Sequence, residues 1–233
     1  MKDYTKRVYA HILTYLENLD HLNVVGTSNI AYPYLSFRYL PSNTFSSLTL
    51  TYLCISVKTF NDCLCLLDGR LKQLTTFIVE FYYIDRNSSM VHNSNDLPNL
   101  KCFSLICYGL IKEYDNKIGS LLRRMLYLEK LTLYLRIANQ GIFIDPIHLI
   151  NEFSKCMSRL HSFKFYLNTE NNRNDFVRYM CNKDIKQNYV NIGYQEVSDI
   201  ISALDPTTYH IFTLPFEFIK FSFIGNIFPN ILF

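Results

Sequence analysis

The chain has 233 residues, of which 49% are apolar and 18% are charged, and its formal net charge at pH 7 is +3. This composition is typical of a folded globular protein and excludes an intrinsically disordered one. The near-neutral charge also lacks the strong basic excess of proteins that bind nucleic acid. We therefore expect a globular protein with no nucleic-acid partner.

An apolar pattern of the form L-x-x-L-x-x-L-x-L recurs along the chain, most regularly from Met125 to Leu133. Its six copies begin at residues 16, 47, 71, 97, 125 and 157, so successive copies start 31, 24, 26, 28 and 32 residues apart. Each copy indicates a helix end, a tight connection and a short strand with alternating sides. Self-similarity at this period predicts a solenoid of the leucine-rich-repeat type. We expect six parallel strands in sequential order in one sheet, centred near residues 23, 55, 79, 105, 133 and 165.

The predicted strands alternate with helices and loops. In chain order we expect helix 5–16, strand 22–24, loop 26–46, strand 53–57, helix 59–71, strand 77–81, loop 84–96, strand 103–107, helix 115–125, strand 131–135, helix 145–157 and strand 163–167. Three of the helix starts have recognisable signals. Thr59-Phe-Asn-Asp62 has the form of a capping box, Asp115 is an N-cap residue, and Asp145-Pro146 is an N-cap followed by proline at the first helical position.

The repeat pattern divides the chain into two parts. Residues 1–167 are predicted to form an irregular α/β solenoid of six units, with parallel strands on the concave face and helices on the convex face. Residues 168–233 form a segment without the repeat. Within it we expect a short helix at 183–190 and a hairpin of strands 197–204 and 209–214, joined by the turn Asp-Pro-Thr-Thr. The apolar end, 216–233, is either a cap on the solenoid or the start of its continuation.

Alternate residues of the strands point away from the core and form the predicted concave binding face. The candidate binding residues on this face are Tyr52, Glu80, Lys130, Thr132, Tyr134, Lys164 and Tyr166. The last two strands place two lysines beside two tyrosines, and such side chains are common anchors of interfaces. Ammonium groups beside amphipathic rings favour an acidic or phosphorylated peptide as the partner. The alternative is a solvated sheet that has no partner on this face.

The sequence lacks the common motifs of catalytic chemistry. It contains no G-x-S-x-G, G-x-x-x-x-G-K-[ST], G-x-G-x-x-G or H-E-x-x-H motif, so we predict no catalytic residue, no cofactor and no metal. His148 and Glu152 stand four residues apart, a spacing that favours an exposed helical pair over a metal site. Spacing does not exclude a site assembled in space. A small enzyme on an irregular α/β domain is therefore the alternative to a binding protein.

The cysteines indicate a reducing compartment, and the longest uncharged segment does not indicate a membrane span. The seven cysteines form no C-x-x-C pair, and most lie in apolar repeat segments, where a thiol behaves as a small core hydrophobe. We interpret them as reduced thiols of an intracellular, cytoplasmic protein. The longest uncharged run, Tyr39 to Val57, contains Pro41 and many hydroxyl side chains. It is a poor candidate for a bilayer span, so we expect no membrane partner.

Several stretches resemble the repeat region of F-box/leucine-rich-repeat proteins. Leu-Pro-Asn-Leu-Lys-Cys-Phe-Ser-Leu at 97–105 and Leu-Glu-Lys-Leu-Thr-Leu at 128–133 look like the longer, irregular repeats, and blocks 62–77 and 209–216 resemble that family as well. In this family the F-box recruits a ubiquitin-ligase scaffold and the repeats hold the substrate. The resemblance implies a substrate-binding part, with a scaffold contact only through an F-box outside this chain. Leu214-Pro-Phe-Glu-Phe218 matches the F-box opening L-P-x-E, which we interpret as coincidence. We predict a non-enzymatic protein-recognition module.

Overall fold

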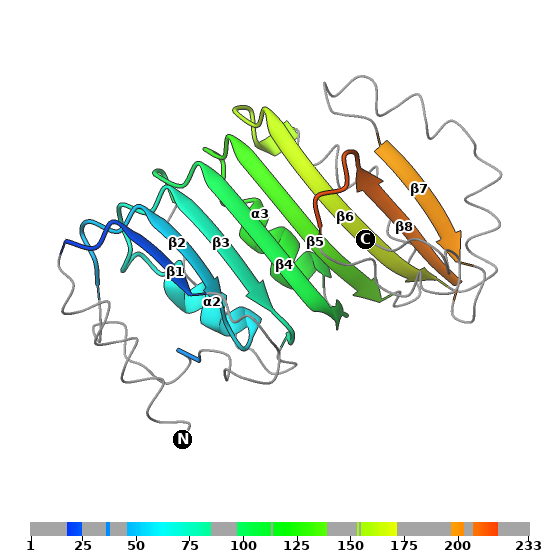
Figure 1. The fold of residues 1–233 in the computed structure, drawn as a ribbon, viewed down its shortest axis with the longest axis horizontal. Helices are drawn as coiled ribbons and strands as arrows, with labels where there is room; N and C mark the ends of the chain where they lie inside the picture. Colours follow the sequence, from blue (N-terminus) through cyan, green and yellow to red (C-terminus); the bar gives the residue numbers. More distant parts are fainter. Residues whose placement is uncertain are drawn as a thin grey trace.

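The computed structural model describes residues 18–24, 36–37, 46–84, 97–112, 114–138, 153, 155–171, 197–202 and 207–218. At its centre is an eight-stranded sheet with the order β1-β2-β3-β4-β5-β6-β8-β7 (Figure 1). The strands are β1 (His21–Val24), β2 (Tyr52–Ser56), β3 (Thr76–Phe81), β4 (Cys102–Ile111), β5 (Lys130–Ala138), β6 (Ser162–Asn171), β7 (Val197–Ser202) and β8 (Thr207–Thr213). From β1 to β6, each strand pairs in parallel with the next one in the sequence. The prediction of six parallel strands in sequential order is confirmed.

The described helices lie on one face of this sheet (Figure 1). They are α2 (Phe60–Leu66), the π-helix η1 (Asp115–Gly119) and α3 (Ser120–Leu122). The predicted capping box of α2 is confirmed. The Asp62 backbone N–H donates to the Thr59 hydroxyl at 3.4 Å, and the Thr59 N–H donates to the Asp62 carboxylate at 3.0 Å. The described part of the chain is therefore an α/β fold with a mostly parallel sheet and few helices.

The hydrophobic core lies between the sheet and these helices. Leu131 and Leu133, in the most regular copy of the apolar pattern, are 1% and 0% exposed. The helical residues Ile118, Leu121 and Leu122, which the sequence places on one face, are buried in the same core. Burial of one such side chain contributes about 1.5–3 kcal/mol. The apolar pattern thus marks residues that fill one continuous core.

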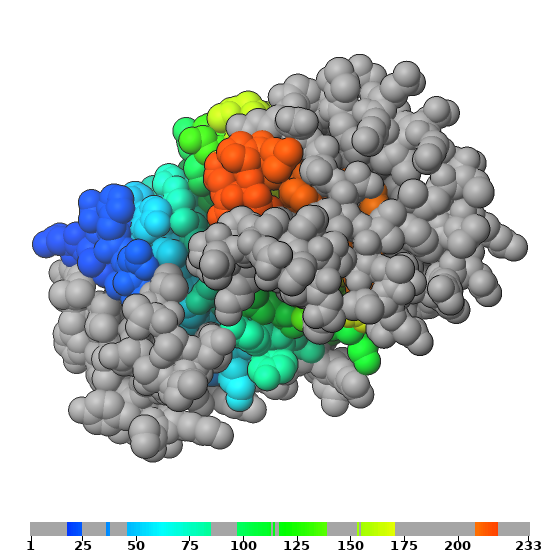
Figure 2. All heavy atoms as spheres, turned by 45° about the vertical axis from the view of Figure 1, so that its right-hand side comes forward, coloured from blue at the N-terminus to red at the C-terminus, as the bar shows by residue number. Residues whose placement is uncertain are grey.

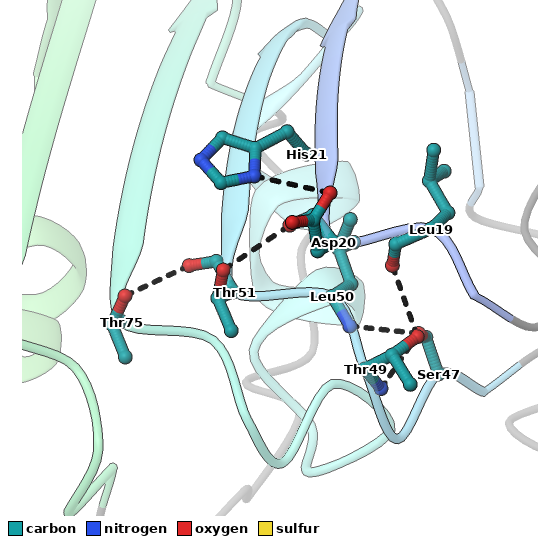
Figure 3. Close-up of polar contacts among 8 residues, drawn as sticks. All are labelled: Leu19, Asp20, His21, Ser47, Thr49, Leu50, Thr51 and Thr75. Atoms are coloured by element: carbon teal, nitrogen blue, oxygen red, sulfur yellow. Dashed lines mark hydrogen bonds and ion pairs between the residues drawn. The ribbon is translucent and has the colours of Figure 1, made fainter.

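The connections before β2, β3, β4, β5 and β6 repeat one set of backbone hydrogen bonds. In each case a carbonyl accepts two successive N–H groups of the following unit, as when the Thr51 carbonyl accepts from Thr75 and Thr76 at 2.8 and 2.9 Å. The carbonyls that do this are those of Asp20, Thr51, Thr75, Lys101 and Glu129. Figure 3 shows the first steps, where the Thr51 and Thr75 hydroxyls also donate to the carbonyls of Asp20 and Thr51. Successive units are therefore joined in the same way.

One unit departs from the apolar pattern because it begins with Ser47. In the unit that begins at Leu71, the Leu74 N–H donates to the Leu71 carbonyl at 3.2 Å. In the Ser47 unit, the Leu50 N–H donates to the serine hydroxyl at 3.0 Å instead (Figure 3). The side chain thus replaces the backbone acceptor of this turn, which gives a physical reason for the polar residue.

The predicted C-terminal hairpin is confirmed, because β7 and β8 pair antiparallel. Its place in the sheet was not predicted. β8 lies between β6 and β7 and pairs antiparallel with β6. The hairpin therefore continues the sheet of the repeat units.

Some predicted elements fall outside the described residues, and others are shorter than expected. Helices 5–16 and 183–190, most of loop 26–46, residues 85–96, the His148–Glu152 pair and the end 219–233 lie outside them. Predicted helix 145–157 is described only at 153 and 155–157. α2 ends at Leu66, before the predicted end at Leu71, and predicted helix 115–125 is observed as η1 and α3. Within the described ranges, no helix has both the length and the hydropathy that crossing a membrane requires.

Candidate functional site

The candidate binding residues lie on the side of the sheet turned away from α2 and α3, which we call the front face. Strand pairing aligns their side chains in rows across the sheet. The first row contains His21, Tyr52, Thr76, Cys102, Lys130 and Ser162, the second Asn23, Cys54, Ile78, Ser104, Thr132 and Lys164, and the third Ser56, Glu80, Ile106, Tyr134, Tyr166 and Phe212. These rows decide which of the predicted residues are neighbours.

Five of the seven predicted binding residues are partly or fully exposed on this face. They are Tyr52, Glu80, Lys130, Thr132 and Lys164. Thr132 and Lys164 are register partners on β5 and β6, and Lys130 lies two residues before Thr132 on the same side of β5. Tyr52 does not join them. It is three strands away, about 14 Å at the usual strand spacing, and its ring stacks on His21 with the centroids 5.3 Å apart.

The predicted exposure of Tyr134 and Tyr166 is wrong. Both side chains point to the front face as predicted, and their rings stack with centroids 4.6 Å apart. Their exposed fractions, however, are only 1% and 0%. The ring of Phe216 lies 5.9 Å from that of Tyr166, and the ring of Phe218 lies 5.7 Å from that of Tyr134. Side chains from after β8 thus cover this part of the face.

The covering segment is Leu214–Phe218, which we call the strap. It follows β8 and turns back across the front of β6 and β5 (Figure 1). In Figure 2 the orange atoms, which belong to β8 and the strap together, reach the surface. The Glu217 carboxylate forms an ion pair with the Lys164 ammonium group. The apolar cluster under and within the strap consists of Ile106, Tyr108, Tyr134, Tyr166, Phe212, Leu214, Phe216 and Phe218.

A bulge in β4 extends the row of aromatic rings. Between the pairs Ile106–Tyr134 and Leu110–Arg136, β4 advances four residues while β5 advances two. The Arg136 guanidinium donates to the Tyr108 carbonyl at 3.1 Å and holds the bulge. The Tyr108 ring then lies 5.4 Å from that of Tyr134, and burial raises the pKa of Tyr108. An aromatic row therefore leads from the strap toward the centre of the sheet.

His210 on β8 holds the hydroxyl of Tyr166 from within the sheet. Its Nδ1 lies 2.8 Å from the Tyr166 hydroxyl, and its Nε2 lies 3.0 Å from the Thr208 hydroxyl. Burial, and secondarily the charge of Arg136, lower the pKa of His210 to about 4. The imidazole is therefore neutral at pH 7. Its position fits a structural role, because both ring nitrogens have hydroxyl partners.

The front face of β2 and β3 offers hydrogen-bonding and apolar groups. The Ser56 hydroxyl donates to the Glu80 carboxylate, and Ile78 is partly exposed beside them. Burial, and then the charge of Glu80, raise the pKa of Cys54, so this thiol is protonated at pH 7. Such groups suit non-covalent contacts with a bound segment.

Sequence reasoning missed Tyr108, His210 and the strap. Gly109 within the apolar run of β4 is a signal for a bulge, and it could have placed Tyr108. The alternation Phe216-Glu-Phe218 in a nearly uncharged end is a weaker signal for a segment with two partly buried rings. The strap occurs once in the chain, so the periodicity that predicts the strands carries no information about it.

In the stretches that the structure describes, no three His, Cys, Asp or Glu side chains lie together as a metal site. Comparisons of the chain with family models, with curated proteins and with solved structures found no match. The front face is therefore the candidate functional site.

Proposed function

We propose that this protein is a recognition module, an irregular leucine-rich-repeat-like solenoid that binds an acidic segment of another protein on its front face. The solenoid reading is supported by the parallel strands in sequential order and by their repeated connections. Solenoids commonly bind partners on such extended strand faces. The observation that carries the proposal is the ion pair of Lys164 with Glu217, because it places a carboxylate on this face.

Two lysines give the front face its preference for acidic groups. Lys130 and Lys164 belong to neighbouring strands, and the Thr132 hydroxyl, the register partner of Lys164, lies on the same face. Ammonium groups bind carboxylates and phosphates through charge-assisted hydrogen bonds. Ile78 and Ile106, partly exposed on β3 and β4, supply apolar contacts for the same segment. The partner is therefore an acidic or phosphorylated segment that also carries apolar side chains.

Site-specific crosslinking tests this proposal. A photoreactive amino acid replaces Thr132 on the front face, and in a control protein it replaces Lys72, which is exposed on the turn before β3. We expect the partner protein to be crosslinked from position 132. The yield of this crosslink should fall in the Lys130→Glu variant and should fall further at high salt. Lys72→Glu makes the same charge change away from the face and should leave the yield unchanged. Equal capture from positions 132 and 72, or no effect of Lys130→Glu, would contradict the proposal.

The resemblance to F-box/leucine-rich-repeat proteins extends the proposal to a ubiquitin-ligase receptor. In this extension the front face holds the protein that is to be ubiquitylated, and an F-box outside this chain contacts the ligase scaffold. A separate purification tests it, in which this chain is fused to an F-box and the co-purifying proteins are identified by mass spectrometry. Scaffold subunits should co-purify together with the captured partner, and absence of a complex that contains both would remove the extension while leaving the binding role.

A further inference from the structure

The strap places the sequence aromatic–acidic–aromatic on the front face. Phe216 contacts Tyr166 on β6, and Phe218 contacts Tyr134 on β5. Between them, Glu217 pairs with Lys164. Phe218 also lies 6.4 Å from the Tyr166 ring, and Phe216 lies 5.4 Å from that of Phe212. The two strap rings and the charge between them therefore pack on a continuous aromatic surface that has one cation at its edge.

Without the strap, this part of the face would offer an unusual combination of groups. The stacked rings of Tyr134 and Tyr166 are nearly fully buried, whereas Tyr52 and Ile106 on the same face are partly exposed. Displacing the strap would expose both rings and would release Lys164. Lys130 stays exposed on the same side of β5, four residues before Tyr134, and has no acidic partner among the described residues. Aromatic rings beside one cation, with a second cation farther along the same face, are complementary to a segment with aromatic and acidic side chains.

The strap is held more loosely than the strand that precedes it. Ile211 and Phe212 of β8 are buried, at 0% and 5% exposure. In the strap, Phe216 and Phe218 are only partly buried, and Glu217 is exposed. The side chains of the Lys164–Glu217 pair are 32% and 49% exposed, and salt screens such a pair. Contacts of this kind can be exchanged without unfolding the sheet.

We propose that the strap is an internal stand-in for the partner, and that a partner segment with an acidic residue between two aromatic residues displaces it from the front face. This inference rests on the proposed function and specifies the partner. An incoming segment with a second acidic residue can also reach Lys130, which gives it a contact that the strap lacks. Only segments that bind the front face more favourably than the strap does would therefore displace it.

The test uses a fluorescent peptide with the strap sequence Leu-Pro-Phe-Glu-Phe and the full chain. The variant Phe216→Ala/Phe218→Ala weakens the strap and leaves Tyr134, Tyr166 and Lys164 in place. We expect it to bind the peptide about tenfold more tightly than the unchanged protein, because the competing state is depopulated. Fluorescence anisotropy measures the affinity, and circular dichroism checks that the variant is folded. Equal affinity for both proteins would overturn the inference.

A second variant serves if the double alanine variant fails to fold. Glu217→Lys keeps both rings of the strap and places two ammonium groups side by side, which repel. This variant should also bind the peptide more tightly than the unchanged protein. If folded Glu217→Lys binds the peptide no better than the unchanged protein does, the inference is wrong.

Charge reversal tests whether the peptide binds in place of the strap. Adding Lys164→Glu to the weakened-strap variant should abolish binding of the glutamate peptide. The same protein should bind the matched peptide Leu-Pro-Phe-Lys-Phe, since the ion pair is then restored in reverse. Binding of the glutamate peptide that is insensitive to Lys164→Glu, or failure of the lysine peptide to bind, would mean that the peptide binds elsewhere.

These outcomes separate this inference from the proposed function. If crosslinking from position 132 captures a partner that needs Lys130, while the strap variants bind the peptide no more tightly than the unchanged protein does, the inference fails and the recognition role stands. If neither experiment shows binding on the front face, both fail. A dimer of the unchanged protein that disappears in the Phe216→Ala/Phe218→Ala variant would show that the strap occupies a second copy of the chain, which also overturns the inference.

Discussion

Gly109 is required by a close approach of two backbones. A Cβ atom at this position would lie 1.7 Å from the carbonyl oxygen of Tyr82, a distance that no backbone-to-Cβ contact tolerates. Gly109→Ala must therefore move Tyr82, which follows β3, or the bulge of β4. We expect it to lower the free energy of unfolding by about 3 kcal/mol, the upper range for overpacking. Chemical denaturation measures this change.

Gly119 provides the matched control for Gly109. A Cβ atom there would lie 3.5 Å from the Arg123 side chain, which is ordinary contact, and the residue has helical dihedral angles, φ −58° and ψ −44°. Gly119→Ala should be neutral or stabilising by about 0.5–1 kcal/mol, as alanine is in helices. Equal destabilisation by the two substitutions would mean that the bulge is not held against Tyr82.

His210 should make the stability of the protein depend on pH. Its pKa is about 4 in the folded protein and about 6.5 when unfolded. Between these values the unfolded chain binds a proton that the folded protein excludes, so stability is full above about pH 6.5 and is lost as the pH falls toward 4. The difference corresponds to on the order of 3 kcal/mol.

The comparison of the unchanged protein with His210→Gln isolates this effect. Carboxylates titrate in both proteins, so their contribution cancels in the difference between the two stability curves. We expect the unchanged protein to lose more stability than the variant when urea denaturation is repeated from pH 7 to pH 4. Parallel curves would show that His210 titrates normally and is not buried as a neutral group.

At the scale of elements, the capping box of α2 does more than start a helix. The Asp62 carboxylate is 0% exposed, and it also accepts the Ser36 hydroxyl at 3.1 Å and the backbone N–H of Phe37. It therefore fastens an earlier part of the chain to the helix. Thr59→Ala should cost about 1 kcal/mol, as loss of an N-cap does, whereas Asp62→Ala should cost about 3 kcal/mol, because it leaves several buried donors without an acceptor.

Thr59→Ser keeps the hydroxyl and serves as the control for the capping box. It should change the free energy of unfolding by less than about 0.5 kcal/mol, since serine caps as well as threonine. Thermal or urea unfolding of the three variants gives the order. If Thr59→Ala costs as much as Asp62→Ala, the contacts of Asp62 with residues 36–37 contribute little.

The strands were predictable from the sequence, whereas the helices were less so. Leu131 and Leu133 are buried in a core formed by residues of their own unit and of the neighbouring units. The alternation of apolar residues with a period of two therefore specifies both the strand and the side that faces the core. For the helical segments, the apolar spacing predicts which residues are buried but not which type of helix forms. The apolar residues of predicted helix 115–125 are all buried, but their backbone is a π-helix and one short α-helical turn, and spacing in the sequence does not separate these forms.

At the scale of the whole molecule, the candidate site was only half predictable. The alternation of β5 and β6 correctly directs Tyr134 and Tyr166 to the front face, because that direction depends on local backbone geometry. Whether the rings are exposed depends on Phe216 and Phe218, which lie far later in the sequence and belong to no repeat. The match of Leu214–Phe218 to an F-box opening gave no indication of this contact.

The order of the strands predicts how the molecule opens. Among the described residues, each strand is hydrogen-bonded only to its neighbours in the sheet, and β1 and β7 are paired on one side only. In such an arrangement opening begins at the ends, because a terminal strand loses one interface while a central strand must lose two. Amide hydrogen exchange, followed by mass spectrometry under native conditions, should be slowest in β4 and β5 and fastest in β1 and β7. Equal protection of β1 and β5 would instead mean that the sheet opens as a single cooperative unit, and the analogy with a solenoid of nearest-neighbour interfaces would fail.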